Sequence, residues 1–511
     1  MSHESRVKKS LLNARINLIF YFLSLILAFF SRKIFLEVLG DDFIGLTGTL
    51  LNLLGFLNLA ELGISTAIGY VLYKPLYEFD KNRISEIISV FGYIYRQIGL
   101  VILCAGCILA CFLPFIFPNN VFNLKIIYFA YFSYLTSSLL GYFINYKQTL
   151  LGADQKNYVI TAYFQSAVLA KTILQIGIVH YTRNYYLWLF AELLLNISYS
   201  FILNWKINQV YPWLKTSIIQ GKTLFKQYPE VMKYTRQLFV HKLGGVVQCQ
   251  TAPFLIYTFA SLKTVAFYGN YTIIIEKINI LVNNLLSSTG AGVGNLIAEG
   301  DNKKIKEVFW ELFSIRFLIA GIISFALYQL TTPFISLWLG KEYLLPRCIL
   351  VMIIINSFIN YTRGATDQFL NGYGLFYDTW APLTEACIYL CIAIIGGALL
   401  GLPGVLFGGI LSQFLIIGIW KPYFLYRQGF KISVLHYWVG FLKHLFIILI
   451  PVPICIHLFP IEKFSPSESY LQWIYYASII VGNYSLLTGI LLYIFTPGIK
   501  MTLKRFLKYK K

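Results

Sequence analysis

The residues most suited to bind a ligand or take part in chemistry are charged side chains inside apolar stretches. Lys171 stands about 13 residues into one such stretch, adjacent Glu276 and Lys277 lie near the middle of another, and Glu61 interrupts a third. A charge within a membrane is costly, so it usually faces a cavity or an opposite charge. We predict that the lysines bind a diphosphate group and that the carboxylates balance their charge or hold a coupling cation. The alternative is an internal ion pair that only orients helices.

Three further charged residues lie near the ends of apolar stretches. Arg15 begins the first stretch, where it would either meet an anionic head group or extend toward water. Arg363 and Asp367 are four residues apart, which is the spacing of an ion pair on one helical face. We predict that this pair either closes an inner gate or serves only structure.

The sequence has no pattern typical of a metal or nucleotide site. Cys104, Cys107 and Cys111 share one helical face, but no His, Asp or Glu lies near them. The glycine-rich segment 290–294 lacks the Lys-Ser/Thr pair of a phosphate loop. We therefore expect no catalytic residue, no metal and no bound cofactor, while a coupling H⁺ or Na⁺ stays open.

Composition identifies the elements that carry these residues. Of 511 residues, 58% are hydrophobic and only 13% are charged, and the mean hydropathy is +0.66. Soluble globular chains are roughly 45–50% apolar and about 25% charged, so a soluble enzyme, a disordered protein and a coiled coil are excluded. The apolar runs are about 20 residues long, which favours helices over a β-barrel. The predicted fold class is an all-α polytopic membrane protein with about 14 transmembrane helices. The second, seventh and eighth of these predicted spans cover 43–72, 239–259 and 265–297.

The distribution of charge predicts the orientation. Lys and Arg number 42 against 22 Asp and Glu, for a net charge of +20. If the N-terminus is inside, roughly 30 basic residues fall on that side and roughly 8 on the other. This asymmetry predicts that both termini are cytoplasmic and that the number of spans is even. It also explains the positive charge without nucleic acid as a partner.

The sequence repeats itself at an offset of about 220 residues. LYEFDKNRISEI, from Leu76, aligns with IAEGDNKKIKEV, from Ile297, so that Asp80 meets Asp301. The sequence FINY also occurs twice, at 143–146 and at 358–361. A period of six spans keeps both copies in the same orientation, as in parallel transporter repeats.

This repeat predicts the domain organisation. Two six-helix lobes cover 1–212 and 235–428, and a cytoplasmic amphipathic linker, 213–234, joins them. Two additional transmembrane helices and a basic cytoplasmic tail follow over 429–511. Two similar bundles that face each other would leave a cleft suited to alternating access.

With these elements in place, the chain resembles the multidrug/oligosaccharidyl-lipid/polysaccharide (MOP) flippase superfamily. Within it, the chain is most similar to bacterial polysaccharide (O-antigen or capsule) repeat-unit flippases. The resemblance covers nearly the whole chain and rests on three segments, LEVLGDDFIGLTGTLLNLLGFLNLAELGISTAIGYVLY, LLGADQKNY and GLPGVLFGGILSQ.

The resemblance implies a MATE-like arrangement in the bacterial inner membrane. It implies translocation of a polyprenyl-diphosphate-linked oligosaccharide from the inner to the outer leaflet, for surface polysaccharide biosynthesis. Membrane lipids and polysaccharide polymerases are the partners that we expect.

Two alternatives remain at this stage. A MATE-type antiporter for small cations should have a net acidic site, whereas the deep residues here include basic ones. A polytopic glycosyltransferase could use the acidic motif at Asp41 and Asp42, but such enzymes commonly have large outer loops, which the predicted topology lacks. We therefore expect a transporter and not an enzyme.

Overall fold

The computed structural model describes residues 6–61, 64–118, 122–154, 156–229, 250–286, 299–375 and 377–502, with isolated positions 247, 293, 296 and 297. Nearly all of these residues are helical, and no strand occurs among them. The chain divides into two compact units, Met1–Ala266 and Phe267–Lys511. The predicted lobe and linker boundaries stay a prediction, and residues 230–246 around the predicted junction lie almost wholly outside the described part.

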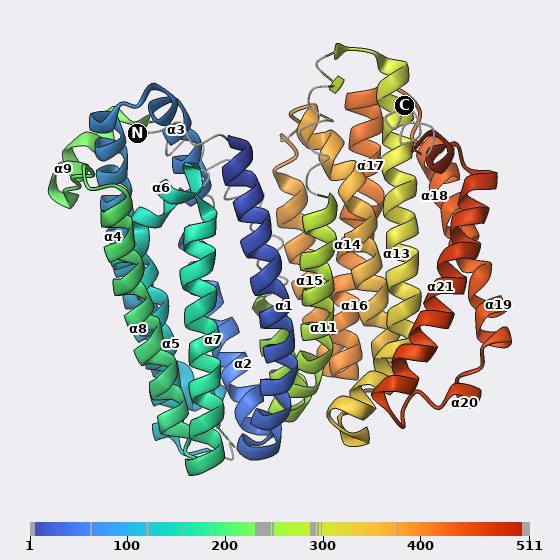
Figure 1. The fold of residues 1–511 in the computed structure, drawn as a ribbon, viewed down its shortest axis with the longest axis horizontal. Coiled ribbons are helices and arrows are strands. Elements are labelled where there is room, and N and C mark those ends of the chain that lie inside the picture. Colours follow the sequence, from blue (N-terminus) through green and yellow to red (C-terminus); the bar gives the residue numbers. More distant parts are fainter. Residues whose placement is uncertain are drawn as a thin grey trace. The chain divides into compact units, whose positions relative to one another are not determined.

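The first unit contains nine labelled α-helices. They are α1 (Arg6–Leu39), α2 (Asp41–Leu57), α3 (Ile64–Glu78), α4 (Lys81–Ile116), α5 (Leu124–Phe143), α6 (Gln148–Ala153), α7 (Asn157–Thr182), α8 (Tyr185–Val210) and α9 (Ile218–Leu224). Three 3₁₀ turns accompany them: η1 (Asn58–Glu61), η2 (Asn145–Lys147) and η3 (Phe225–Gln227). Helix α1 packs on α7, α7 on α8, and α8 on α5, while α4 contacts both α5 and the short α9 (Figure 1).

Helix α11 (Leu262–Leu286) begins in the first unit and continues into the second, which contains the remaining helices. These are α13 (Asn302–Trp338), α14 (Arg347–Gly372), α15 (Trp380–Leu400), α16 (Leu402–Gln413), α17 (Lys421–Phe424), α18 (Leu435–Leu449), α19 (Pro451–Leu458), α20 (Ile461–Phe464) and α21 (Tyr470–Phe495). A 3₁₀ turn, η4 (Lys341–Tyr343), follows α13, and π-helical segments η5 (Phe414–Trp420) and η6 (Leu425–Phe430) flank α17.

The core of the second unit is aromatic. Phe309, Phe313 and Phe317 recur every fourth residue on α13 and are fully buried, so one face of this helix presents a continuous apolar ridge. The Phe309 ring lies 5.3 Å from those of Phe369 on α14 and Phe430 in η6. Helices α14, α18 and α21 all pack on α13, which is therefore the central helix of the unit (Figure 1).

The structure confirms an all-α polytopic membrane fold. Eleven helices of the described residues are long and apolar enough to cross a membrane, and each overlaps a predicted span. Two other predicted spans, 239–259 and 265–297, extend into residues outside the described part. The remaining one, 43–72, is interrupted, because α2 ends at Leu57 and α3 begins only at Ile64.

Two residues that the predicted repeat aligns have similar backbone conformations. Asp80 precedes α4 with φ −75° and ψ 87° and accepts a hydrogen bond from the Arg83 amide. Asp301 precedes α13 with φ −76° and ψ 93° and accepts hydrogen bonds from two amides, including that of Lys304. Each aspartate therefore caps the longest helix of its unit, since its carboxylate satisfies amides that the first turn leaves unpaired.

Small residues allow close helix packing in the GLPGVLFGGILSQ segment. A Cβ atom on Gly404 of α16 would overlap the carbonyl oxygen of Gly396 on α15. A Cβ on Gly408 would lie 2.7 Å from the backbone nitrogen of Ala393. Contact at this distance requires glycine, as is common where membrane helices pack.

Candidate functional site: polar networks of the two units

Glu61 lies at the interruption of the second predicted span, in η1. The Tyr95 phenol on α4 donates to Glu61 Oε1, and the Tyr142 phenol on α5 donates to Oε2 at 2.9 Å. Asn58 Oδ1 accepts from Tyr142 at 3.0 Å and from Ser138 at 3.1 Å. Polar partners on neighbouring helices thus support the 3₁₀ turn, since membranes tolerate a break in an α-helix where it is buried in protein. The result is a half-buried carboxylate held by two phenol groups.

Lys171 makes an ion pair with a residue that the sequence analysis did not single out. Its Nζ lies 2.6 Å from Oε1 of Glu192, so the ion pair connects α7 to α8. Gln175 and Asn196 each donate to the same carboxylate at 3.2 Å, and Asn196 also donates to Ser137 on α5. Both charged side chains are mostly buried, with 18% and 14% exposure. The network therefore matches the structural alternative for Lys171, while a substrate contact stays a prediction.

The other predicted binding residues lie on α1 and α11. Arg15 is exposed on α1, Glu276 is exposed on α11, and Lys277 is half-buried beside it. On the same helix as Lys277, the residues Ile278 and Val282 pack against α13 and α14. This packing fixes the rotation of α11 and with it the direction in which Lys277 leaves the helix.

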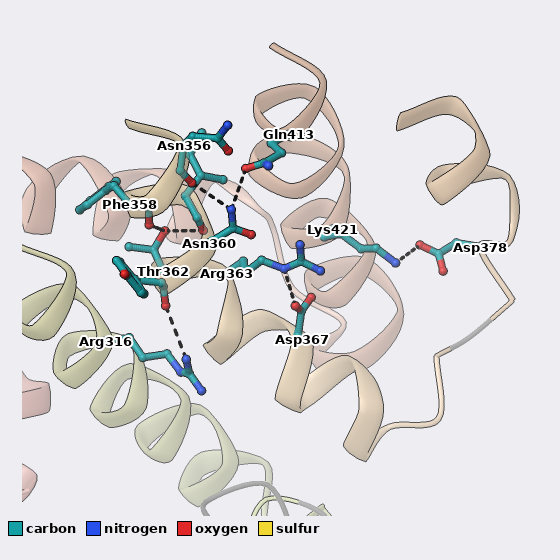
Figure 2. A network of polar contacts seen from close by, with 12 residues as sticks. Arg316, Asn356, Phe358, Asn360, Thr362, Arg363, Asp367, Asp378, Gln413 and Lys421 are labelled. Atoms are coloured by element: carbon teal, nitrogen blue, oxygen red, sulfur yellow. Dashed lines mark hydrogen bonds and ion pairs between the residues drawn. The ribbon is translucent and has the colours of Figure 1, made fainter. Parts of the chain in front are cut away.

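The second unit holds the larger polar network, which Figure 2 shows. The predicted pair is present on α14, with Arg363 Nε 2.7 Å from Asp367 Oδ2. Its role as a gate stays a prediction. Glu385, on α15, interacts electrostatically with both members of the pair and with Lys421. Four charges from three helical segments therefore gather at one place.

Two further polar groups extend this network along α14. Arg316 of α13 donates to the Tyr361 carbonyl at 3.5 Å (Figure 2). Its guanidinium covers Gly364, where a Cβ atom would overlap it. Asn360 donates to Gln413 at the end of α16, at 3.4 Å. Arg316 lies 14 residues beyond the start of α13, so this cation is an internal residue of the helix.

A second ion pair connects the loop before α15 to α17. The Lys421 ammonium lies 2.7 Å from Oδ2 of Asp378 (Figure 2). The Trp420 indole donates to the same oxygen at 3.1 Å. The Asp378 side chain is only 1% exposed, and its Oδ1 has no hydrogen-bond partner in the described part of the chain. The carboxylate charge therefore depends on Lys421.

The first unit has a similar contact at the corresponding loop. Asp154, after α6, accepts from the Tyr211 phenol at 2.8 Å and from Lys156 at 2.7 Å, both through Oδ2. The Lys156 ammonium also lies 4.9 Å from the centre of the Tyr211 ring. Burial and the neighbouring carboxylate raise the pKa of Tyr211, so the phenol stays a donor at neutral pH.

Sequence reasoning missed Glu192, Glu385, Asp378 and the two tyrosines around Glu61. The rule that flagged Lys171 would also have flagged Glu192 and Glu385, since both lie within apolar spans. No signal in the sequence pointed to Asp378. Among the described residues, no three His, Cys, Asp or Glu side chains are placed to hold a metal ion.

Comparison with solved structures places this geometry in a known fold. The lipid II flippase MurJ, in an inward closed conformation, aligns with a TM-score of 0.65 and 15% identity, over 93% of this chain and 98% of its own. An inward-facing multidrug resistance MATE family transporter of the MOP superfamily aligns with a TM-score of 0.59 and 13% identity, over 80% and 97%. A Vibrio cholerae MATE transporter, VcmN, aligns with a TM-score of 0.52 and 14% identity, over 84% and 100%.

These likenesses confirm the predicted MATE-like fold. The fold is shared with transporters and flippases, including one for lipid II. No protein-family model and no curated protein matches the sequence. The narrower resemblance to polysaccharide repeat-unit flippases stays a prediction.

Proposed function

We propose that the protein is a flippase for a polyprenyl-diphosphate-linked oligosaccharide in the bacterial cytoplasmic membrane. It would carry the head group from the inner to the outer leaflet by alternating access, in the biosynthesis of a surface polysaccharide. Both termini would be cytoplasmic, and a polysaccharide polymerase would use the product. The observation that carries the proposal is a set of basic residues within the long helices of a flippase-like fold: Lys277, Arg316 and Arg363.

The chemistry of a diphosphate supports this assignment. A diphosphate that leaves water needs cations, and arginine and lysine provide charge-assisted hydrogen bonds of about twice the strength of neutral ones. Arg363 is balanced by Asp367, and Lys171 by Glu192. Partial neutralisation suits transport, because the head group must be released on the other side. Lys277, half-buried on α11, is the principal candidate for the diphosphate, and Arg15, exposed on α1, is the candidate for first contact with the lipid.

The lipid tail would remain in the bilayer during transport. Each CH₂ group that moved from hydrocarbon into a polar cavity would lose about 0.8 kcal/mol. A long polyprenyl chain therefore stays outside while the sugar crosses. The two predicted lobes would alternate to expose the head group to one side at a time, and Glu61 or Glu276 would balance the charge of the empty state.

The direct test is transport by purified protein in liposomes. A fluorescent polyprenyl-diphosphate oligosaccharide would be placed in the vesicles, and the fraction accessible to an impermeant quencher would be followed with time. Faster exchange than in protein-free vesicles is expected, together with accumulation of the lipid-linked glycan in cells that lack the gene. Equal rates with and without the protein would contradict the proposal.

A cation antiporter is the second candidate, and a specific observation favours it. Glu61 is a carboxylate at a broken span, held by Tyr95 and Tyr142, and two structural neighbours are MATE transporters. Efflux of a fluorescent organic cation from the same vesicles distinguishes the two functions. Cation efflux without movement of the lipid-linked sugar would establish the antiporter instead.

A further inference from the structure

The segment between α8 and the end of η3 has an unusual charge distribution. No acidic residue occurs between Glu192 and Glu230, whereas the same stretch contains four lysines. Of these, Lys215, Lys222 and Lys226 are exposed. The stretch itself therefore contains no carboxylate that could neutralise its lysines.

One side of α9 packs against α4. A Cβ atom on Gly221 would overlap the backbone carbonyl of Ser89, so the two helices touch at their backbones. The Ser217 amide donates to Ser89 Oγ at 3.1 Å, and the Phe225 ring lies 6.1 Å from that of Tyr93. These contacts fix the rotation of α9 relative to α4 (Figure 1).

A further contact holds the end of this segment. The Tyr228 phenol donates to Glu86 Oε2 at 2.7 Å. Burial, followed by the hydrogen bond to Glu86, raises the pKa of Tyr228 to about 12, so the phenol remains a donor across the physiological range. The segment is thus held at its start, middle and end, and its outer side is defined.

The opposite side of α9 and η3 carries both charge and an apolar residue. Ile219, Lys222, Thr223 and Lys226 follow the i, i+3, i+4, i+7 spacing of one helical face, and all four are exposed. Ile219 is the extreme case, with 83% of its surface exposed. An exposed branched aliphatic side chain between lysines is the composition of a helix that lies on a membrane surface.

We propose that this face of α9 and η3 binds anionic phospholipid head groups. The lysines would contact lipid phosphates, and Ile219 would insert at the boundary between head groups and acyl chains. Exposed aromatic residues also occur toward the end of α8, where Phe201 is 59% and Trp205 57% exposed. The occupant is a lipid of the surrounding leaflet, since α8 is a membrane span that ends only eight residues before α9. The proposal does not depend on which substrate the protein carries.

Lipid binding by the purified full-length chain tests the proposal. Phosphatidylglycerol or phosphatidylcholine would be added to the protein in detergent, and bound lipids would be counted by native mass spectrometry at several salt concentrations. The wild type should retain phosphatidylglycerol preferentially, and less of it at high salt. The double variant Lys222→Gln/Lys226→Gln should bind it about thirtyfold more weakly at low salt and lose most of the salt dependence.

Two further variants separate the contributions. Ile219→Ser should weaken binding about tenfold while the salt dependence is retained. Lys303→Gln/Lys304→Gln, at the start of α13, removes the same charge from two other exposed lysines and should leave binding close to that of the wild type. Equal retention of the two lipids by the wild type would overturn the proposal. An equal loss in both lysine double variants would do the same, since the effect would then follow net charge and not this surface.

Discussion

Asp154 and Asp378 occupy corresponding loops of the two units, and each accepts two hydrogen bonds through a single carboxylate oxygen. Asp154 connects the loop before α7 to Tyr211, directly after α8. Asp378 connects the loop before α15 to Trp420 and Lys421, in the span formed by α16, η5 and α17. In both copies of the predicted repeat, an aspartate in the loop between the fourth and fifth spans therefore contacts residues in or directly after the sixth span, although the donors differ in type.

The contacts of Asp154 and Asp378 should differ in their contribution to stability. Lys421→Met leaves the Asp378 carboxylate buried without a cation, and we expect a loss of about 3 kcal/mol in the free energy of unfolding. Lys156→Met should cost only about 1 kcal/mol, because the Asp154 side chain is 22% exposed. Thermal unfolding of the purified variants in detergent would measure both. A larger loss in Lys156→Met would show that burial does not set the order.

The ion pair between Lys171 and Glu192 should behave as a unit. We expect Lys171→Met to destabilise the protein by about 3 kcal/mol, because Glu192 is then left as an unpaired charge between helices. The double variant Lys171→Met/Glu192→Leu should recover most of that loss. Transport by the stable double variant then decides the role of Lys171: activity close to wild type assigns the pair to structure, and strong loss assigns it to the substrate.

Lys277 should affect transport more than stability. Lys277→Ala is expected to reduce export of the lipid-linked glycan at least tenfold at matched protein levels, and Lys277→Arg should retain more activity because it keeps the charge. Lys263→Ala is a matched control, since it removes an exposed lysine near the start of the same helix. Unchanged export in Lys277→Ala would remove this residue from the mechanism and leave the flippase proposal intact.

Glycine substitutions should distinguish helix contacts from open helix surface. Gly404→Ala places a methyl group against the Gly396 carbonyl, so α15 and α16 must separate, and we expect a loss of about 2 kcal/mol. Gly482→Ala, on α21, meets no atom within 4 Å and should stabilise the protein by up to about 1 kcal/mol. Unfolding temperatures of the two variants provide the comparison, and an equal change in both would contradict the proposed packing.

Several features of the fold were predictable because they depend on local sequence. Apolar runs of about 20 residues predict spans, since a helix of that length matches the hydrocarbon thickness. The repeat aligned Asp80 with Asp301, and both residues are helix caps, since a cap involves only the residue and the next turn. Arg363 and Asp367 were predicted to pair because four residues make about one helical turn, which brings the side chains together.

The pairing of charges between helices was decided only by the tertiary structure. Lys171 and Glu192 lie 21 residues apart, and Asp378 and Lys421 lie 43 apart; no local period connects either pair. The two tyrosines that hold Glu61 come from two other helices, α4 and α5. Each of these contacts depends on how a helix is rotated about its axis and how far it is shifted along its neighbour. Packing of side chains along the whole length of both helices determines these two quantities, whereas the apolar character of a span determines only that it crosses the membrane.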